Sequence, residues 1–245
     1  MRRTATITTT QDRGNSHVDH FDRAFSRDRG VAAMMGRTHC ASGVAAWLAG
    51  AALLAHLGHG PGPVSTAAGA VLCGAGALLP DIDHPGSTVT RVHPGTTVAS
   101  WIIRRFVEHR GATHYLSTAV VTGVIVGAAV AVPPFGWWTI VAAGLVALTV
   151  AGAAPGRYAL PASALSALAV ATGRWWVGLA VGTGMAVHTL GDALTRDGSP
   201  LWGPWSRRRV KLLWLTTGSR AERWVVRPAL IVAGLGSALW WMVAG

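Results

Sequence analysis

The chain has 245 residues, of which 51% are hydrophobic and only 13% are charged, and its formal net charge is +11. A composition this apolar argues against an ordinary soluble domain and indicates a membrane protein. Its two cysteines, Cys40 and Cys73, lie in apolar surroundings, which argues against a disulfide-rich scaffold and a cysteine-based zinc site.

The first 35 residues differ from the rest of the chain. They are polar, rich in Thr, Arg, Asp and His, and without an apolar period, which is typical of a disordered segment. We therefore expect a disordered leader over 1–35 and a single membrane domain over 36–245.

Apolar segments follow one another from residue 42 onward. They predict an all-α fold, a polytopic membrane helical bundle. We give the number of spans as about six to seven because several segments are shorter than the ~20 residues of a full span. The candidate spans are 42–57, 64–80, 115–132, 137–154, 158–173, 175–194 and 229–244. Small residues spaced four apart, as at Gly178, Gly182 and Ala186, would permit close helix packing, although composition alone explains them equally well.

The basic residues indicate an orientation. They gather in the leader and in the connections 81–114 and 195–228, whereas the turns 58–63 and 133–136 contain no Lys or Arg. Even numbers of spans separate the three basic regions, so the positive-inside rule places all three in the cytoplasm. The alternative interpretation, contact with nucleic acid, loses most of its support, and we expect no specific nucleic-acid partner.

Histidines and carboxylates adjoin the cytoplasmic span ends in four separate segments. They are His39, Asp81, Asp83, His84, His109, His114, His188 and Asp192. Ionisable residues at such positions in a membrane protein predict a functional site.

The segment 78–86, LLPDIDHPG, ends the second span. We expect Pro80 to stop the helix, so that Asp81, Asp83 and His84 turn toward the other segments. Two carboxylates this close repel each other unless a cation or a shared proton relieves them. A helix cap followed by a solvated turn is the alternative.

The segment 109–114, HRGATH, places two histidines around a glycine. Gly111 permits a tight backbone turn, Arg110 can clamp an anionic oxygen, and Thr113 can donate to a phosphate. Arg110 also fits as one more arginine of the cytoplasmic face, but that explanation leaves the two histidines unexplained.

His188 and Asp192 are four residues apart and share one face of a helix. Imidazole and carboxylate without thiolate form the ligand set of hydrolytic divalent-metal sites. The sequence therefore predicts a site for one or two ions, zinc first, with manganese or magnesium as alternatives.

Four motifs occur in the order in which a known family has them. They are GRTHCASG at 36–43, LLPDIDHPGS at 78–87, HRGATHY at 109–115 and HTLGDALTRDGSPLWGPW at 188–205. The chain thus resembles, over roughly 36–210, the YdjM-like family of bacterial inner-membrane metal-dependent hydrolases. That family looks distantly related to the zinc phospholipase C and single-strand nuclease superfamily.

The resemblance implies phosphoester hydrolysis by a metal-activated water. Carried over residue by residue, it implies as metal ligands His39, Asp81, Asp83, His84, His114, His188 and Asp192. It places His109 and Arg110 beside them as catalytic or phosphate-contacting residues, and Asp83 would also accept a proton from the water. Tyr115 departs from the family, which usually has Ser there.

The segment 198–212, GSPLWGPWSRRRVKL, joins two tryptophans to a basic cluster. An interfacial belt explains it, and a lid that holds a lipid headgroup is the alternative. We expect a hydrolase that meets membrane lipid or a small phosphoester at the cytoplasmic face. A metal- or proton-binding protein or transporter without catalysis is the main alternative, and a regulatory protein docking on the basic loops is another.

Overall fold

In a computed structural model of the chain, residues 15–91, 94–131 and 175–244 are described, together with Ala162, Ala164, Ser166 and Ala167. The α-helices are α1 (Asn15–His56), α2 (Pro63–Gly76), α3 (Thr88–Arg91), α4 (Pro94–Ile103), α5 (Leu116–Ala131), α8 (Trp176–Ala193) and α9 (Arg227–Ala244). Shorter turns are the 3-10 helices η1 (Pro80–Asp83) and η2 (Ala112–His114) and the π-helical η3 (Glu222–Val226). The described ranges contain isolated β-bridges but no strand, which confirms the all-α prediction.

Three helices in the described residues are long and apolar enough to cross a membrane. They are Gly36–His56, Pro63–Asp83 and Glu222–Val243, and Leu116–Ala131 is a shorter apolar helix. The helices predicted at 115–132, 175–194 and 229–244 are present to within two residues. The candidate span 137–154 lies outside the described residues, and 158–173 lies almost wholly outside them.

Helix α1 extends far beyond the span predicted at 42–57. It has 42 residues and begins at Asn15, within the leader for which we expected no regular structure. The sequence has no proline between residues 15 and 56, so nothing in this segment breaks the backbone ladder. Residues 1–14 of the leader lie outside the described part of the chain.

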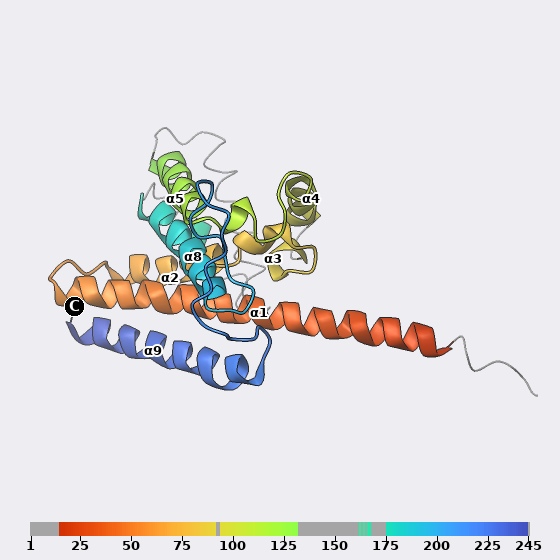
Figure 1. Cartoon of the computed structure of the whole chain (residues 1–245). Coiled ribbons are helices and arrows are strands. Elements are labelled where there is room, and N and C mark those ends of the chain that lie inside the picture. The colour runs from red at the N-terminus through yellow and green to blue at the C-terminus, as the bar shows by residue number, and fades with distance from the viewer. Residues whose placement is uncertain are drawn as a thin grey trace, which may run out of the picture.

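Helices α1 and α9 lie side by side and run in the same direction (Figure 1). Gly234 lies against Ala45, and the rings of His56 and Trp240 are 6.1 Å apart near the far ends of the two helices. Helix α2 returns along α1 in the opposite direction, with Gly69 against the ring of Trp47. One end of this group therefore carries residues 36, 83 and 222, and the other carries 56, 63 and 243.

Helices α5 and α8 cross this group and pack closely on each other (Figure 1). A Cβ atom on Gly178 would lie 2.1 Å from the carbonyl oxygen of Gly123, and one on Gly184 would lie 2.1 Å from that of Cys73 in α2. Close packing through small residues, predicted as one of two explanations for their spacing, is therefore observed. The buried core between these helices includes Leu72 and Val177.

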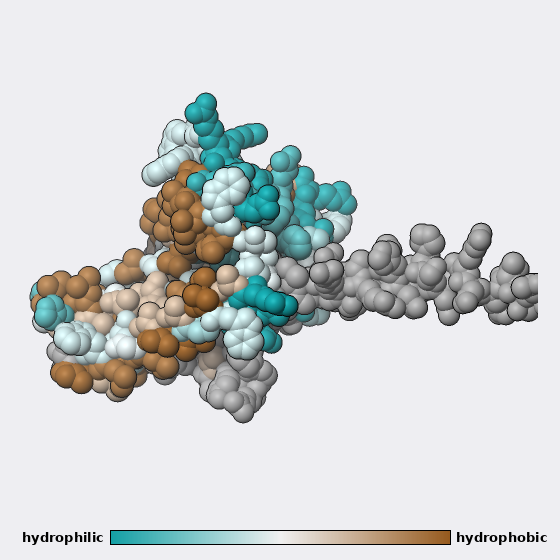
Figure 2. Space-filling model, turned by 60° about the horizontal axis from the view of Figure 1, so that its bottom comes forward, coloured by the Kyte–Doolittle hydropathy of each residue, from teal (hydrophilic) through white to brown (hydrophobic). Residues whose placement is uncertain are grey.

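The surface separates by polarity. In Figure 2, hydrophobic residues dominate the end where α1 and α9 finish, and hydrophilic residues gather around the loops. Large apolar side chains are also exposed along α5 and α9, including Val124 and Val232. Such a surface is typical of helices that face lipid.

Candidate metal centre

The end of α2 delivers two carboxylates through a tightened turn. Successive 3-10 hydrogen bonds, from Leu78 N to Ala75 O (2.9 Å) and from Leu79 N to Gly76 O (3.1 Å), lead into η1. Pro80 is the first residue of η1, and the α-helix has already ended at Gly76. We had expected Pro80 to end α2, but it begins the 3-10 turn that follows the helix.

Helix α8 delivers His188 and Asp192 from its last turns, and both side chains are buried. The Nδ1 atom of His188 lies 2.7 Å from the carbonyl oxygen of Ala77, to which it donates. A backbone acceptor on Nδ1 fixes the tautomer, so Nε2 carries the lone pair. The ring therefore presents an electron-pair donor to the interior of the site.

The loop after α4 delivers His109 and Arg110, and η2, which follows it, delivers His114. Arg110 has φ +58°, in the left-handed region, whereas Gly111 has φ −95°. Gly111 is needed for space, because a Cβ there would lie 2.6 Å from the carbonyl oxygen of Glu108. The turn that we assigned to the freedom of Gly111 is thus made by its neighbour, at a cost of about 1–2 kcal/mol.

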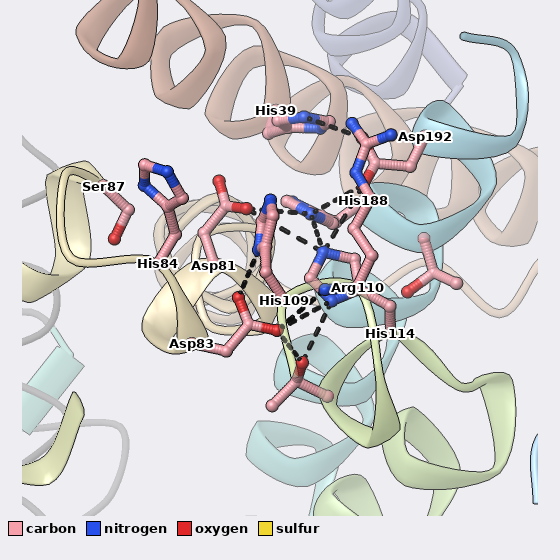
Figure 3. A network of polar contacts seen from close by, with 12 residues as sticks. His39, Asp81, Asp83, His84, Ser87, His109, Arg110, His114, His188 and Asp192 are labelled. Atoms are coloured by element: carbon pink, nitrogen blue, oxygen red, sulfur yellow. Dashed lines mark hydrogen bonds and ion pairs between the residues drawn. The ribbon is translucent and has the colours of Figure 1, made fainter. Parts of the chain in front are cut away.

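Four side-chain atoms from three segments meet at the centre of the site, where His114 and His188 point toward each other (Figure 3). Their Nε2 atoms are 3.3 Å apart. Asp81 Oδ1 lies 3.8 and 3.7 Å from these two nitrogens, and Asp192 Oδ2 lies 3.4 and 3.6 Å from them. A tetrahedral zinc ion with bonds of about 2.0–2.1 Å spaces its ligand atoms about 3.3–3.4 Å apart. His114 and His188 thus lie at a spacing close to that of zinc ligands. Asp81 joins both of them in a group that can hold an ion, whereas Asp192 joins His188 and His39 in another.

His39 extends this centre from α1. Its ring stacks on that of His188 with centroids 3.9 Å apart, and its Nε2 is 3.5 Å from Asp192 Oδ1. His39, His188 and Asp192 together form a group that can hold an ion. His39 thus lies where it can replace one ligand of the central set or hold the second oxygen of Asp192.

Asp83 forms a second group with Asp81 and His109 that can also hold an ion. Its Oδ1 lies 2.7 Å from His109 Nδ1, and its Oδ2 accepts from the hydroxyl of Thr113 and from the backbone N–H of Arg110. The hydroxyl of Thr113 is thus directed at a carboxylate, where we had expected it to contact a phosphate. The buried Asp83 orders the whole 109–114 loop.

Arg110 binds the carboxylate of Asp192 through two of its guanidinium nitrogens. Its Nε lies 3.3 Å from Asp192 Oδ2 and its Nη2 lies 3.4 Å from Oδ1, the fork geometry of strong arginine–carboxylate pairs. Its Nη1 donates to Gly198 O at 3.3 Å and lies 3.5 Å from Asp197. The sequence reasoning missed Asp197, whose only signal was its place in the TRDGSP segment.

His84 lies at the edge of the site. Its Nδ1 accepts from the backbone N–H of Gly86 at 3.1 Å, and its ring is 4.9 Å from that of His109. Among the described residues, His84 belongs to none of the groups that can hold an ion. All the other predicted ligands do, and His109, predicted to be catalytic, joins one of these groups as well.

Two of the histidines that lie outside the spans have pKa values shifted in opposite directions. Burial alone would lower the pKa of His114, but its hydrogen bonds with Asp192 and Asp83 raise that pKa to about 9. Burial and the neighbouring His109 lower the pKa of His84. Without an ion, His114 therefore carries a proton whose charge faces the carboxylates.

A pocket of about 260 Å³ opens beside the cluster. Its lining is His109, Arg110, Asp197, Arg209 and Thr217. The side chain of His109 is 41% exposed although its Nδ1 is held by Asp83. The cluster thus meets solvent through a small, mainly basic opening.

Comparison with known proteins bears on the whole chain. The family model described as "YdjM inner membrane protein" matches residues 34–244. Neither the curated proteins nor the solved structures give a match. The family match confirms the resemblance seen in the four motifs and extends it beyond residue 210 to include α9.

Proposed function

Because the chain belongs to the YdjM inner membrane protein family, we propose that its polar centre serves a membrane-bound, divalent-metal-dependent hydrolase. The substrate class we propose is a phosphoester at the cytoplasmic face of the membrane. One observation carries this proposal: two imidazole nitrogens lie 3.3 Å apart in a buried site, and a carboxylate oxygen of Asp81 and one of Asp192 each lie within 3.8 Å of both.

The donor set favours zinc. Two nitrogen and two oxygen donors suit zinc, whereas magnesium prefers six oxygens and several waters. Asp81, His114 and His188 would hold the ion with Asp192 beside them, and the group of Asp81, Asp83 and His109 offers a place for a second. A bound ion would supply positive charge that lowers the pKa of a water and offsets the charge of a phosphoryl oxygen.

The neighbouring residues suit proton transfer and phosphate binding. Asp83 holds Nδ1 of His109. The other ring nitrogen, Nε2, is therefore the one that would donate a proton to the leaving alcohol. Asp83 is also the carboxylate that we propose accepts a proton from water. Arg110 and Arg209, at the pocket beside His109, would orient the phosphate.

The charge distribution supports a cytoplasmic site in a multi-pass protein. The site lies at the end of the spans that carries residues 36, 83 and 222. Arg37, Arg220 and Arg223 adjoin that end, whereas the sequence has no Lys or Arg in 38–90 or after Arg227. By the positive-inside rule, the basic end faces the cytoplasm.

Metal or proton binding without catalysis is the second candidate, and the burial of the centre favours it. His114, His188 and Asp192 are almost inaccessible to solvent. A transport site, however, is expected near the middle of the bilayer, whereas His39 lies only three residues into its span and Asp83 ends the next one. Position at the span ends, beside a basic pocket, supports hydrolysis.

Metal analysis combined with a phosphoesterase assay tests the proposal. The purified wild type should carry stoichiometric metal and hydrolyse aryl phosphate esters, and His188→Ala should lose both. His109→Ala should keep the ion held by His114 and His188 and lose about 10²–10⁴-fold in rate, the usual contribution of a positioned acid or base. His59→Ala, an exposed histidine at the opposite end, is the matched control and should change neither.

The outcomes separate the two candidates. A wild type without metal, or a His188→Ala variant that keeps it, would contradict the metal site itself. A protein that binds metal through these residues but hydrolyses no phosphoester would favour the non-catalytic candidate.

A further inference from the structure

An apolar chamber of about 340 Å³ adjoins the metal centre on the side of His39. It lies between α1, α8 and α9 and is closed by the loop 212–217. Its wall is mainly apolar and includes Leu190, Leu215, Val226 and Leu230. Its titratable lining residues are His39 and Glu222. Its volume falls within the range of about 300–1,000 Å³ that small-molecule sites occupy.

The chamber and the basic pocket adjoin the same loop and share one wall residue. Thr217 lines both the apolar chamber and the pocket that contains His109, Arg110 and Arg209. A third pocket, lined by Arg196 and Lys211 among others, shares Thr217 with both. A ligand that passes over Thr217 would meet a cationic end at His109, Arg110 and Arg209 and an aliphatic end beside His39.

We propose that the substrate is an amphiphile, a membrane lipid with a phosphoester in its headgroup. Its phosphate would lie among His109, Arg110 and Arg209, and one acyl or alkyl chain would enter the chamber beside His39. This inference rests on the proposed function and specifies its substrate. In the reaction, a water oxygen bonds to phosphorus, the ester P–O bond breaks, and the leaving alcohol takes up a proton.

The chamber wall favours a lipid over a nucleotide. Proteins commonly hold nucleobases by stacking them on aromatic rings. The lining of this chamber includes no Phe, Tyr or Trp, and the ring of His39 already stacks on that of His188. The basic run Arg207, Arg208 and Arg209 beside the site would attract an anionic headgroup. Leu190 and Leu212 line the chamber and are also exposed at the surface, so the chamber opens at an apolar surface.

The direct test is how hydrolysis depends on the length of the substrate's alkyl chain. The full-length protein in detergent micelles is compared on phosphate esters with one headgroup and chains of two to sixteen carbons. Each methylene that enters the chamber should raise kcat/KM by about fourfold until the chamber is full. A kcat/KM independent of chain length, with hydrolysis intact, would overturn the lipid inference and leave the proposed function standing.

A matched pair of variants on α9 tests whether the alkyl chain of the substrate lies in the chamber. Leu230→Trp fills the chamber and should lower kcat/KM for long chains at least tenfold, with short-chain hydrolysis and metal content unchanged. Leu235→Trp makes the same change at a residue that is 62% exposed on the same helix and outside the chamber lining. It should leave every measurement unchanged. Equal losses on short and long chains in Leu230→Trp would contradict the assignment.

A binding measurement decides the inference even if no ester is hydrolysed. A hexadecyl phosphonate should bind the wild type at least a hundredfold more tightly than methyl phosphonate, and Leu230→Trp should remove most of that difference. If hydrolysis is absent while this preference holds, the proposed function fails and the lipid site stands. Equal binding of the two phosphonates would overturn the lipid site.

Discussion

Arg110 combines a strained backbone with a buried side chain whose nitrogens are all engaged. Only 6% of this residue is exposed, and it holds Asp192 and the 197–198 loop at once. A left-handed conformation at a non-glycine residue persists where the surroundings enforce it. Arg110 therefore acts first on a ligand of the proposed metal, and its contact with a phosphate comes second.

The Arg110→Lys variant tests this order. A lysine keeps the charge but loses the fork on Asp192, so metal affinity should fall by about 10–100-fold, as for other residues that orient a ligand. Competition with a chromogenic chelator measures it. Arg104→Lys, at an exposed arginine before the same loop, is the control. Unchanged metal affinity with weaker substrate binding would show that Arg110 serves the phosphate alone.

Pro80 has a role that follows from the hydrogen bond it cannot make. The 3-10 bonds on either side of it run from each N–H to the carbonyl three residues back, at Leu79 to Gly76 and at Ile82 to Leu79. The N–H at position 80 would occupy Ala77 O by the same pattern, and proline has none. Ala77 O is instead the acceptor for His188 Nδ1 at 2.7 Å.

The Pro80→Ala variant should therefore loosen a histidine on another helix. The new N–H would compete with His188 for Ala77 O. Because His188 would then be less well oriented, metal affinity should fall by about 10–100-fold, as it does when other such supporting partners are removed. The exposed Pro85, in the same segment, gives the matched control Pro85→Ala. If both variants bind metal like the wild type, the orientation of His188 does not depend on this carbonyl.

At the scale of the helices, glycine contacts hold the site together. Helix α8 carries His188 and Asp192, and its glycines let its backbone approach α5 and α2 closely. Without water to drive association, packing of small residues is the main attraction between helices in lipid. The position of two proposed ligands thus depends on glycines several turns away from them.

The Gly178→Ala variant should separate α8 from α5. Its Cβ would meet Gly123 O at 2.1 Å, so the backbones must move, and overpacking of this kind costs about 1–3 kcal/mol. Thermal unfolding in detergent measures the loss. Gly50→Ala, at a helical glycine with no neighbouring atom within 4 Å, is the control and should be neutral or slightly stabilising. Equal effects at the two positions would refute the close contact.

At the scale of the whole molecule, the sequence predicted the parts that depend on local pattern. Apolar length predicted α5, α8 and α9, and polar residues at span ends predicted the members of the cluster. Spacing could not predict the fork from Arg110 to Asp192, because the two residues are 82 positions apart and meet only when α8 packs. His84 looked equivalent to Asp81 and Asp83, but the backbone turn directs its Nδ1 to Gly86.

The direction of the helices gives the last prediction. Helices α1 and α9 run the same way, so the residues at their far ends, near His59 and Val243, should face the side opposite to the metal centre. In a variant with Cys40 and Cys73 replaced by alanine, single cysteines at positions 59, 208 and 243 can be tested in spheroplasts. A membrane-impermeant maleimide should label positions 59 and 243 directly, and position 208, in the basic loop, only after lysis. Labelling of position 208 in intact spheroplasts would place the site outside the cytoplasm, and protection of 243 with labelling of 59 would contradict the parallel arrangement.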